Sequence, residues 1–227
     1  MIDIKLHYIE KGEGKPLVLL HGNGEESGCF INQINYFSRD YRVIAVDTRG
    51  HGRSPRGSKP FTLGQFVEDL KNFLDDLGLT RINLLGFSDG GNVAMLFALK
   101  YPEYLEKLVL NGANSCPWGV RARYQIPVVL SYCIEAIRSL VDKKAVSKKE
   151  LVGLMVKEPR IKRKELFKLK VPTLVIAGDR DMVGHRHTVK LAKSLPGGRL
   201  SILKGDHFIV YKEWEAFNRE VGKFLQS

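Results

Sequence analysis

A serine flanked by glycines stands between an apolar run and a helical pattern. Residues 86–91 read GFSDGG, after the strand-like run 81–85 and before a helix expected to begin near Asn92. In the G-x-S-x-G pattern a tight strand-to-helix turn strains the serine backbone and lifts the hydroxyl above a sheet. Glycines two positions away avoid the collisions that side chains would cause. The pattern predicts a nucleophilic Ser88; the alternative is a glycine-rich turn with an incidental serine.

A serine nucleophile needs a base to take its proton, and the base needs an orienting acid. Residues 178–181 (GDRD) follow the apolar run 172–177, and residues 205–208 (GDHF) follow the run 199–203. Open α/β sheets place their sites at the carboxyl ends of strands, where both groups lie. His207 is therefore the candidate general base. Three carboxylates are candidates for orienting it: Asp179, Asp181 and Asp206.

A developing oxyanion needs two backbone donors. Residues 21–24 (HGNG) follow the apolar run 16–20 and form a glycine-rich loop of the kind that supplies one of them. We assign the donors to the N–H groups of Asn23 and of Asp89, the residue after the nucleophile. His21 and the polar segment 47–54 are expected to brace this loop. We expect no metal site.

Short runs of branched apolar residues alternate with helical patterns along the chain. The runs are continuous rather than alternating, which indicates strands buried on both faces, as in a parallel sheet between helices. Apolar residues at helical spacing between residues 63 and 77 predict one of the helices. Residues 2–10 are expected to form an antiparallel edge hairpin with the following strand. The fold class is therefore α/β, with a mostly parallel twisted sheet flanked by helices.

The alternation breaks between residues 114 and 168, where no strand pattern occurs. We predict a small helical cap there, inserted after the sixth strand, and a core domain of residues 1–113 and 169–227. Four residues of this cap are expected to line an apolar acyl pocket, Trp118, Tyr124, Ile126 and Tyr132, with Trp118 and Tyr124 as the substrate-binding candidates; packing on the core is the alternative for each.

Charge is distributed unevenly over the 227 residues. The formal net charge is +11, and residues 115–170 hold fourteen Lys or Arg against five Asp or Glu. No recognition motif accompanies the basic segment, so we expect no nucleic-acid partner. No apolar segment is long enough for a membrane span and the first residues lack a secretory pattern, so we expect no membrane partner. Three unpaired cysteines favour a cytoplasmic protein. A monomer or a homodimer is compatible with these features.

Taken in order, residues 21–24, 47–54, 86–91, 178–181 and 205–208 resemble the α/β-hydrolase superfamily over nearly the whole chain. This resemblance implies the α/β-hydrolase fold, selects Asp181 as the orienting acid and requires no cofactor. Residues 86–91, 100–102 and 112–114 are similar to the valacyclovirase (biphenyl hydrolase-like) branch. The branch implies that Asp89 receives the α-amino group of amino-acid esters. The alternative is a carboxylate that stabilises the first turn of its helix.

The predicted activity is that of a serine hydrolase cleaving small carboxylic esters, α-amino-acid esters among them, through an acyl-enzyme intermediate. A C–C bond hydrolase or a cofactor-free perhydrolase with the same triad is the enzymatic alternative. Anionic substrates would be favoured if the basic cap faced the pocket rather than water. A non-catalytic ligand-binding receptor is the alternative from another class.

Overall fold

The computed structural model describes residues 3–227. Their strands form one twisted sheet in the order β1-β3-β2-β4-β5-β6-β7, in which all neighbours from β3 to β7 are parallel. The strands are β1 (Tyr8–Lys11), β2 (Lys15–Leu20), β3 (Tyr41–Val46), β4 (Ile82–Phe87), β5 (Leu105–Asn111), β6 (Thr173–Gly178) and β7 (Gly198–Leu203). Every residue of β4 and β6 is buried, as the continuous apolar runs predict.

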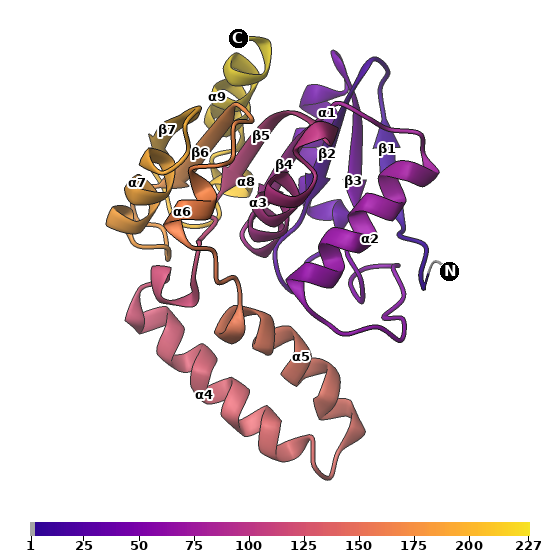
Figure 1. Ribbon diagram of the computed structural model, residues 1–227, viewed down its shortest axis with the longest axis vertical. Helices are drawn as coiled ribbons and strands as arrows, with labels where there is room; N and C mark the ends of the chain where they lie inside the picture. Colours follow the sequence, from indigo (N-terminus) through magenta and orange to yellow (C-terminus); the bar gives the residue numbers. More distant parts are fainter. Residues whose placement is uncertain (1–2) are drawn as a thin grey trace.

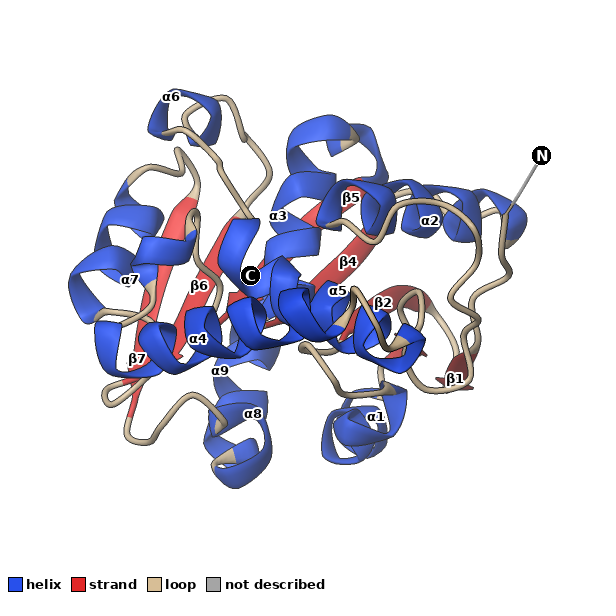
Figure 2. Ribbon diagram, turned by 90° about the horizontal axis from the view of Figure 1, so that it is seen from below, coloured by secondary structure: helices blue, strands red, loops and turns tan. Residues whose placement is uncertain are grey.

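Helices cover both faces of the sheet (Figures 1 and 2). One face packs against α2 (Leu63–Asp76), α3 (Asp89–Lys100) and α7 (His185–Lys193). The other packs against α1 (Ile31–Phe37), α8 (Ile209–Lys212) and α9 (Trp214–Gln226). Thr62 accepts a hydrogen bond from the backbone N–H of Gln65 and caps α2. The helix begins at Leu63, where the spacing of apolar residues predicts its start. The predicted α/β class is confirmed.

Two details of the predicted topology are wrong. The first strand, β1, pairs antiparallel with β3, with Tyr8 opposite Val46, and does not form a hairpin with β2. It begins at Tyr8, and Ile2, part of the predicted strand, lies outside the described residues. The helical insertion follows β5, because only five strands precede it among the described residues, rather than the six we expected.

The insertion consists mainly of α4 (Ala122–Arg138) and α5 (Lys143–Lys157), followed by the short α6 (Arg163–Leu166). Figure 1 shows α4 and α5 as a helical hairpin that projects from the sheet, with the connecting turn at its far end. Polar and apolar contacts fasten α5 to the core: the ion pair of Arg56 with Glu150, the hydrogen bond from Asn23 Nδ2 to the Leu151 carbonyl at 2.8 Å, and the buried side chain of Leu154. The division into core and cap at residues 114 and 168 stays a prediction.

Within residues 3–227, no helix has the length and apolar character needed to cross a bilayer.

Candidate active site

Ser88 occupies the sharp turn between β4 and α3. Its backbone has φ 54° and ψ −120°, a conformation that side-chain-bearing residues rarely adopt, and its N–H donates to the Asn111 carbonyl at 2.8 Å. A Cβ at Gly86 would lie 2.2 Å from the Gly90 carbonyl oxygen, and a Cβ at Gly90 would lie 2.2 Å from the Leu20 carbonyl oxygen. The two glycines of the motif are therefore required by close backbone packing.

Three side chains form a continuous hydrogen-bonded chain above the sheet. His207 Nδ1 lies 2.7 Å from Asp181 Oδ1, and His207 Nε2 lies 3.0 Å from Ser88 Oγ. A carboxylate only accepts hydrogen bonds, so Nδ1 carries the proton in this pair, and in the neutral imidazole Nε2 then accepts the Ser88 O–H. Asp181 and His207 are both almost fully buried. The geometry is that of a nucleophile, its base and an orienting acid.

The other two carboxylate candidates bind elsewhere. Asp179 Oδ1 accepts the backbone N–H of Gly205 at 2.9 Å. Asp206 Oδ1 accepts the N–H of Phe208 at 2.8 Å, and its second oxygen pairs with Lys212. Only Asp181, among the three, contacts the imidazole.

Gly112 lies against the imidazole, a contact that residue types alone did not indicate. It has φ 60°, and a Cβ there would lie 2.7 Å from His207 Cε1. Glycine is needed both for the backbone conformation and for the close approach. The positive φ in the loop after β5 therefore lets the chain pass directly beside the base.

The two predicted oxyanion donors lie on the loop after β2 and on the first turn of α3. The first helical hydrogen bond of α3 runs from Asn92 N–H to the Ser88 carbonyl, so the N–H of Asp89 precedes the intrahelical bonds. Within residues 3–227 neither this N–H nor that of Asn23 donates to another backbone group, and their role as oxyanion donors stays a prediction. The side chain of Asn23 fixes its loop by donating to Asp89 Oδ2 at 2.9 Å and to the Leu151 carbonyl.

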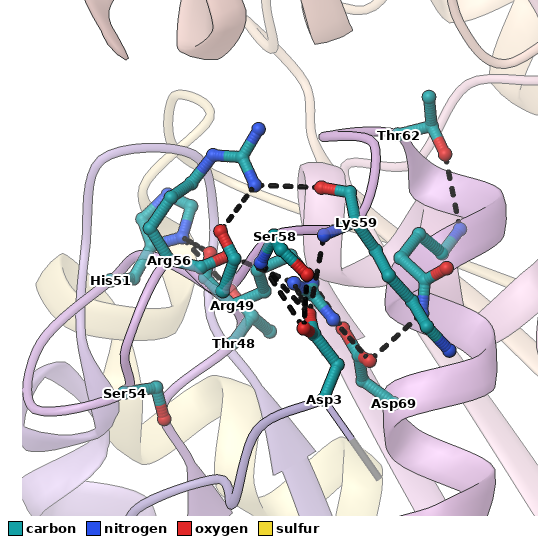
Figure 3. Close-up of polar contacts among 12 residues, drawn as sticks. Asp3, Thr48, Arg49, His51, Ser54, Arg56, Ser58, Lys59, Thr62 and Asp69 are labelled. Atoms are coloured by element: carbon teal, nitrogen blue, oxygen red, sulfur yellow. Dashed lines mark hydrogen bonds and ion pairs between the residues drawn. The ribbon is translucent and has the colours of Figure 1, made fainter. Parts of the chain in front are cut away.

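His21 braces this loop from behind. Its Nδ1 donates to the Gly22 carbonyl at 2.8 Å, and its Nε2 accepts the backbone N–H of Thr48 at 3.0 Å. Burial lowers the pKa of His21 to about 4, so the ring is neutral near pH 7. The loop that contains Thr48 is itself held by the fully buried Arg49, which binds Asp69 through two nitrogens and Asp3 through a third (Figure 3).

Asp89 is buried beside the nucleophile. Its carboxylate accepts hydrogen bonds from Asn23 Nδ2 at 2.9 Å and from Asn92 Nδ2 at 3.1 Å. Burial nevertheless raises the pKa of this carboxyl above its usual value. Asn92 was missed as a site residue, although its position three residues after Asp89 on one helix face was a usable signal.

A cavity of about 220 Å³ opens above Ser88 and His207. Its lining from the insertion includes Tyr124, Gln125, Val128, Met155 and Glu158. Trp118 is 81% exposed and Ile126 is also exposed, and neither they nor Tyr132 belong to the lining. The prediction that these three side chains line the pocket is therefore wrong. Tyr124 does line the cavity.

The side chains of the cavity lining that ionise near neutral pH are His207 and two carboxyls. Among the described residues that line it, Asp89 and Glu158 are acidic and none is a lysine or an arginine. Glu158 Oε2 accepts the N–H of Leu63 at the start of α2, at 3.0 Å. Burial, with a further contribution from the charge of Asp89, raises the pKa of Glu158. The basic side chains of the cap therefore do not face this cavity. Sequence reasoning missed Glu158.

No group of three His, Cys, Asp or Glu side chains within residues 3–227 has the arrangement of a metal-ligand set.

The fold and this arrangement are those of a hydrolase built on a parallel sheet, and comparison with known proteins agrees. The family described as the alpha/beta hydrolase fold matches residues 15–133, so the chain belongs to the α/β-hydrolase family. This confirms the resemblance drawn from the motifs.

Relatives and solved structures extend the likeness over nearly the whole chain. Serine hydrolase BPHL of Homo sapiens is 28% identical over 98% of this chain and 84% of its own length. A 2-hydroxy-6-oxononadienedioate/2-hydroxy-6-oxononatrienedioate hydrolase of Burkholderia vietnamiensis is 30% identical over 95% of this chain and 76% of its own. The enol-lactonase structure from Burkholderia xenovorans LB400 superposes with a TM-score of 0.83 at 23% identity, covering 99% and 97% of the two chains.

Proposed function

We propose that this chain is a serine hydrolase that cleaves small carboxylic esters through an acyl-enzyme intermediate. One observation carries the proposal: Asp181, His207 and Ser88 are joined by hydrogen bonds of 2.7 and 3.0 Å directly beneath a cavity of about 220 Å³. A cavity of this size suits a small substrate.

In the acylation step, Ser88 Oγ attacks the ester carbonyl carbon while its proton passes to His207 Nε2. Asp181 stabilises the imidazolium through Nδ1–H. The negative charge that develops on the carbonyl oxygen is received by the N–H groups of Asn23 and Asp89. Collapse of this intermediate breaks the bond to the alcohol oxygen, which takes the proton from His207 Nε2 and leaves as the alcohol.

Deacylation repeats these steps with water. His207 takes a proton from the water, the resulting hydroxide attacks the acyl carbon, and the proton returns to Ser88 Oγ as the acid leaves. Loss of one oxyanion donor slows such reactions roughly 10²- to 10³-fold. The fastening of Asn23 to Asp89 and to Leu151 therefore has a catalytic consequence, because it holds one of these donors in place.

The substrate class that we propose is esters with a cationic group, such as the ammonium of α-amino-acid esters. The cavity contains two carboxylates, Asp89 and Glu158, without a lysine or arginine among its described lining residues. A buried carboxylate next to a forming oxyanion opposes catalysis unless a cation compensates its charge. A substrate ammonium supplies that cation.

Matched substrates test this specificity. We expect an aminoacyl ester to be hydrolysed with a higher kcat/KM than its deaminated twin, and Asp89→Asn to reduce that ratio at least tenfold. Asp206→Asn is the matched control, because Asp206 is a partly exposed carboxylate that pairs with Lys212 outside the cavity. Equal kcat/KM for the two esters in the wild type would exclude the cationic substrate class.

Hydrolysis of a C–C bond is the second candidate function. The likeness to the nonadienedioate hydrolase favours it, since the same triad serves both reactions. A dienedioate carries two carboxylates, however, and the acidic cavity offers no cationic side chain among its described residues to receive them. Turnover of dienedioates in preference to esters would replace our proposal by this one.

A cofactor-free perhydrolase would be revealed by peracid formation from acid and peroxide.

A receptor without catalysis is the alternative from another class. Labelling with a fluorophosphonate probe separates the two, because only an activated serine reacts rapidly. We expect rapid labelling of the wild type and none of Ser88→Ala. Slow labelling together with ligand-dependent binding of a partner protein would favour the receptor. We further propose that the enzyme works in the cytoplasm, because its three free cysteines favour that compartment. We also propose that it needs no cofactor.

A further inference from the structure

The outer face of α4 carries apolar side chains that no part of residues 3–227 covers. Ile126, Leu130, Ile134 and Ile137 recur at helical spacing, and Leu140 and Val141 follow in the turn to α5. All six are between 57% and 91% exposed. We call these six residues the apolar stripe. A contiguous stripe of this length on an exposed helix indicates a binding surface rather than the scattered apolar exposure that is normal.

The opposite face of α4 is polar where it packs. Its buried residues are Gln125, which donates to the Met155 carbonyl at 3.0 Å, and Glu135, which pairs with Lys148 at 3.0 Å. Lys149 also donates to the Ser139 hydroxyl. Polar contacts therefore hold α4 on α5, and the apolar stripe is left to face outward. Figure 1 shows that the hairpin projects away from the sheet, which leaves its turn open to a flat surface.

The charges beside the apolar stripe identify its partner. Arg123 is exposed at the start of α4, and Lys143 and Lys144 are exposed at the start of α5, next to the turn. The acidic groups of the hairpin are already engaged, because Glu135 binds Arg138 and Lys148, and Asp142 caps the Lys144 N–H at 2.8 Å. A second copy of this chain would bring the same basic residues together. An anionic lipid surface complements both the apolar stripe and the basic residues.

We propose that the α4–α5 hairpin docks on anionic membrane surfaces, with the apolar stripe in the interfacial layer and Arg123, Lys143 and Lys144 on lipid headgroups. This is the binding mode of an interfacial amphipathic helix. The sequence led us to expect no membrane partner because no segment could span a bilayer, a criterion that surface docking does not need to meet. The inner side of α4 contributes Tyr124 to the cavity, so a docked hairpin brings the site close to the lipid surface.

Co-sedimentation of the full chain with vesicles tests the proposal. We expect binding to phosphatidylcholine vesicles that contain phosphatidylglycerol, at least tenfold weaker binding to pure phosphatidylcholine, and weakening with salt. Leu140→Ser combined with Val141→Ser should reduce binding at least tenfold. Lys143→Glu with Lys144→Glu should reduce it by about fivefold or more for each lysine. Leu200→Ser, at an exposed leucine of β7 outside the hairpin, is the control and should bind as the wild type does.

Three results would overturn the proposal. The first is no binding to the anionic vesicles at low salt by a protein whose circular dichroism is native. The second is vesicle binding that neither of the two double variants changes, which would indicate nonspecific charge attraction. The third is a dimer in solution that the same variants disperse, which would make the apolar stripe a subunit interface. Ser88→Ala should bind vesicles like the wild type, so the result is independent of the proposed hydrolysis.

Discussion

Protonation of His21 should weaken the folded protein as the pH falls. The ring lies buried behind the oxyanion loop, and burial lowers its pKa from 6.5 to about 4. Between these two values the unfolded chain binds a proton that the folded chain does not, so the free energy of unfolding decreases as the pH falls through this range. Above pH 6.5 the contribution of His21 is fully present.

The magnitude follows from the two pKa values. One unit of difference corresponds to about 1.4 kcal/mol, so the shift from 6.5 to about 4 is equivalent to about 3 kcal/mol when fully expressed. At pH 5 most of the unfolded chains are protonated at this ring and few of the folded ones are. The expected loss between pH 7 and pH 5 is therefore about 2 kcal/mol, a large fraction of a typical domain's stability.

Urea unfolding at pH 7 and pH 5 measures this loss. Burial also lowers the pKa of His51, which can add to the pH dependence, so the decisive quantity is the difference between the wild type and His21→Gln. We expect the variant to be less stable at pH 7, because two hydrogen bonds change, and to lose about 2 kcal/mol less on acidification. His185→Gln, at an exposed histidine, is the control. The reasoning is refuted if His21→Gln and the wild type lose the same free energy.

Four further outcomes are expected. Asp181→Asn should lower kcat about 10⁴-fold because His207 loses its orienting acceptor, whereas Asp179→Asn should leave kcat nearly unchanged; steady-state kinetics compare them. Gly86→Ala should abolish activity and lower Tm in thermal unfolding, since its Cβ would collide with a backbone carbonyl; wild-type values would contradict the packing described. Arg49→Gln should lower the free energy of unfolding by about 3–5 kcal/mol, measured in urea, because two carboxylates lose a buried partner. Because burial raises the pKa of Asp89, this carboxyl is neutralised at a higher pH than an ordinary aspartate. The preference for aminoacyl over deaminated esters should therefore fall as the pH is lowered from 7 over the range in which the enzyme stays active, and a constant ratio of kcat/KM would count against Asp89 as the cation site.

Much of the fold was accessible from the sequence because local patterns encode it. The continuous apolar runs located β2 to β6, whose residues are mostly buried on both faces of the sheet. The run 199–203 also located β7, although this edge strand is only partly buried. The glycines around Ser88 predicted the turn for the reason that the coordinates give, namely backbone atoms too close for a Cβ. The chain order of serine, acid and histidine then restricted the candidates for the members of the catalytic triad.

What the sequence missed depends on contacts between distant segments. Strand β1 pairs with β3, which is separated from it in the sequence by β2 and α1. The short loop after β1 instead led us to expect a local hairpin with β2. Glu158 is held beside the cavity by a hydrogen bond from the N–H of Leu63, 95 residues away in the sequence. A contact between such distant residues has no local sequence pattern that would predict it. Trp118 was assigned to the pocket from its residue type, but the chain turns it outward before α4 begins.

The most direct test of the proposed relay is to identify the residue that carries the acyl group. The protein is mixed with an excess of p-nitrophenyl ester, quenched in acid within the first turnover and digested for peptide mass spectrometry. We expect one acyl group on Ser88, released as product more slowly when His207 is replaced by alanine. An acyl group on another residue, or undiminished hydrolysis by Ser88→Ala, would contradict the account.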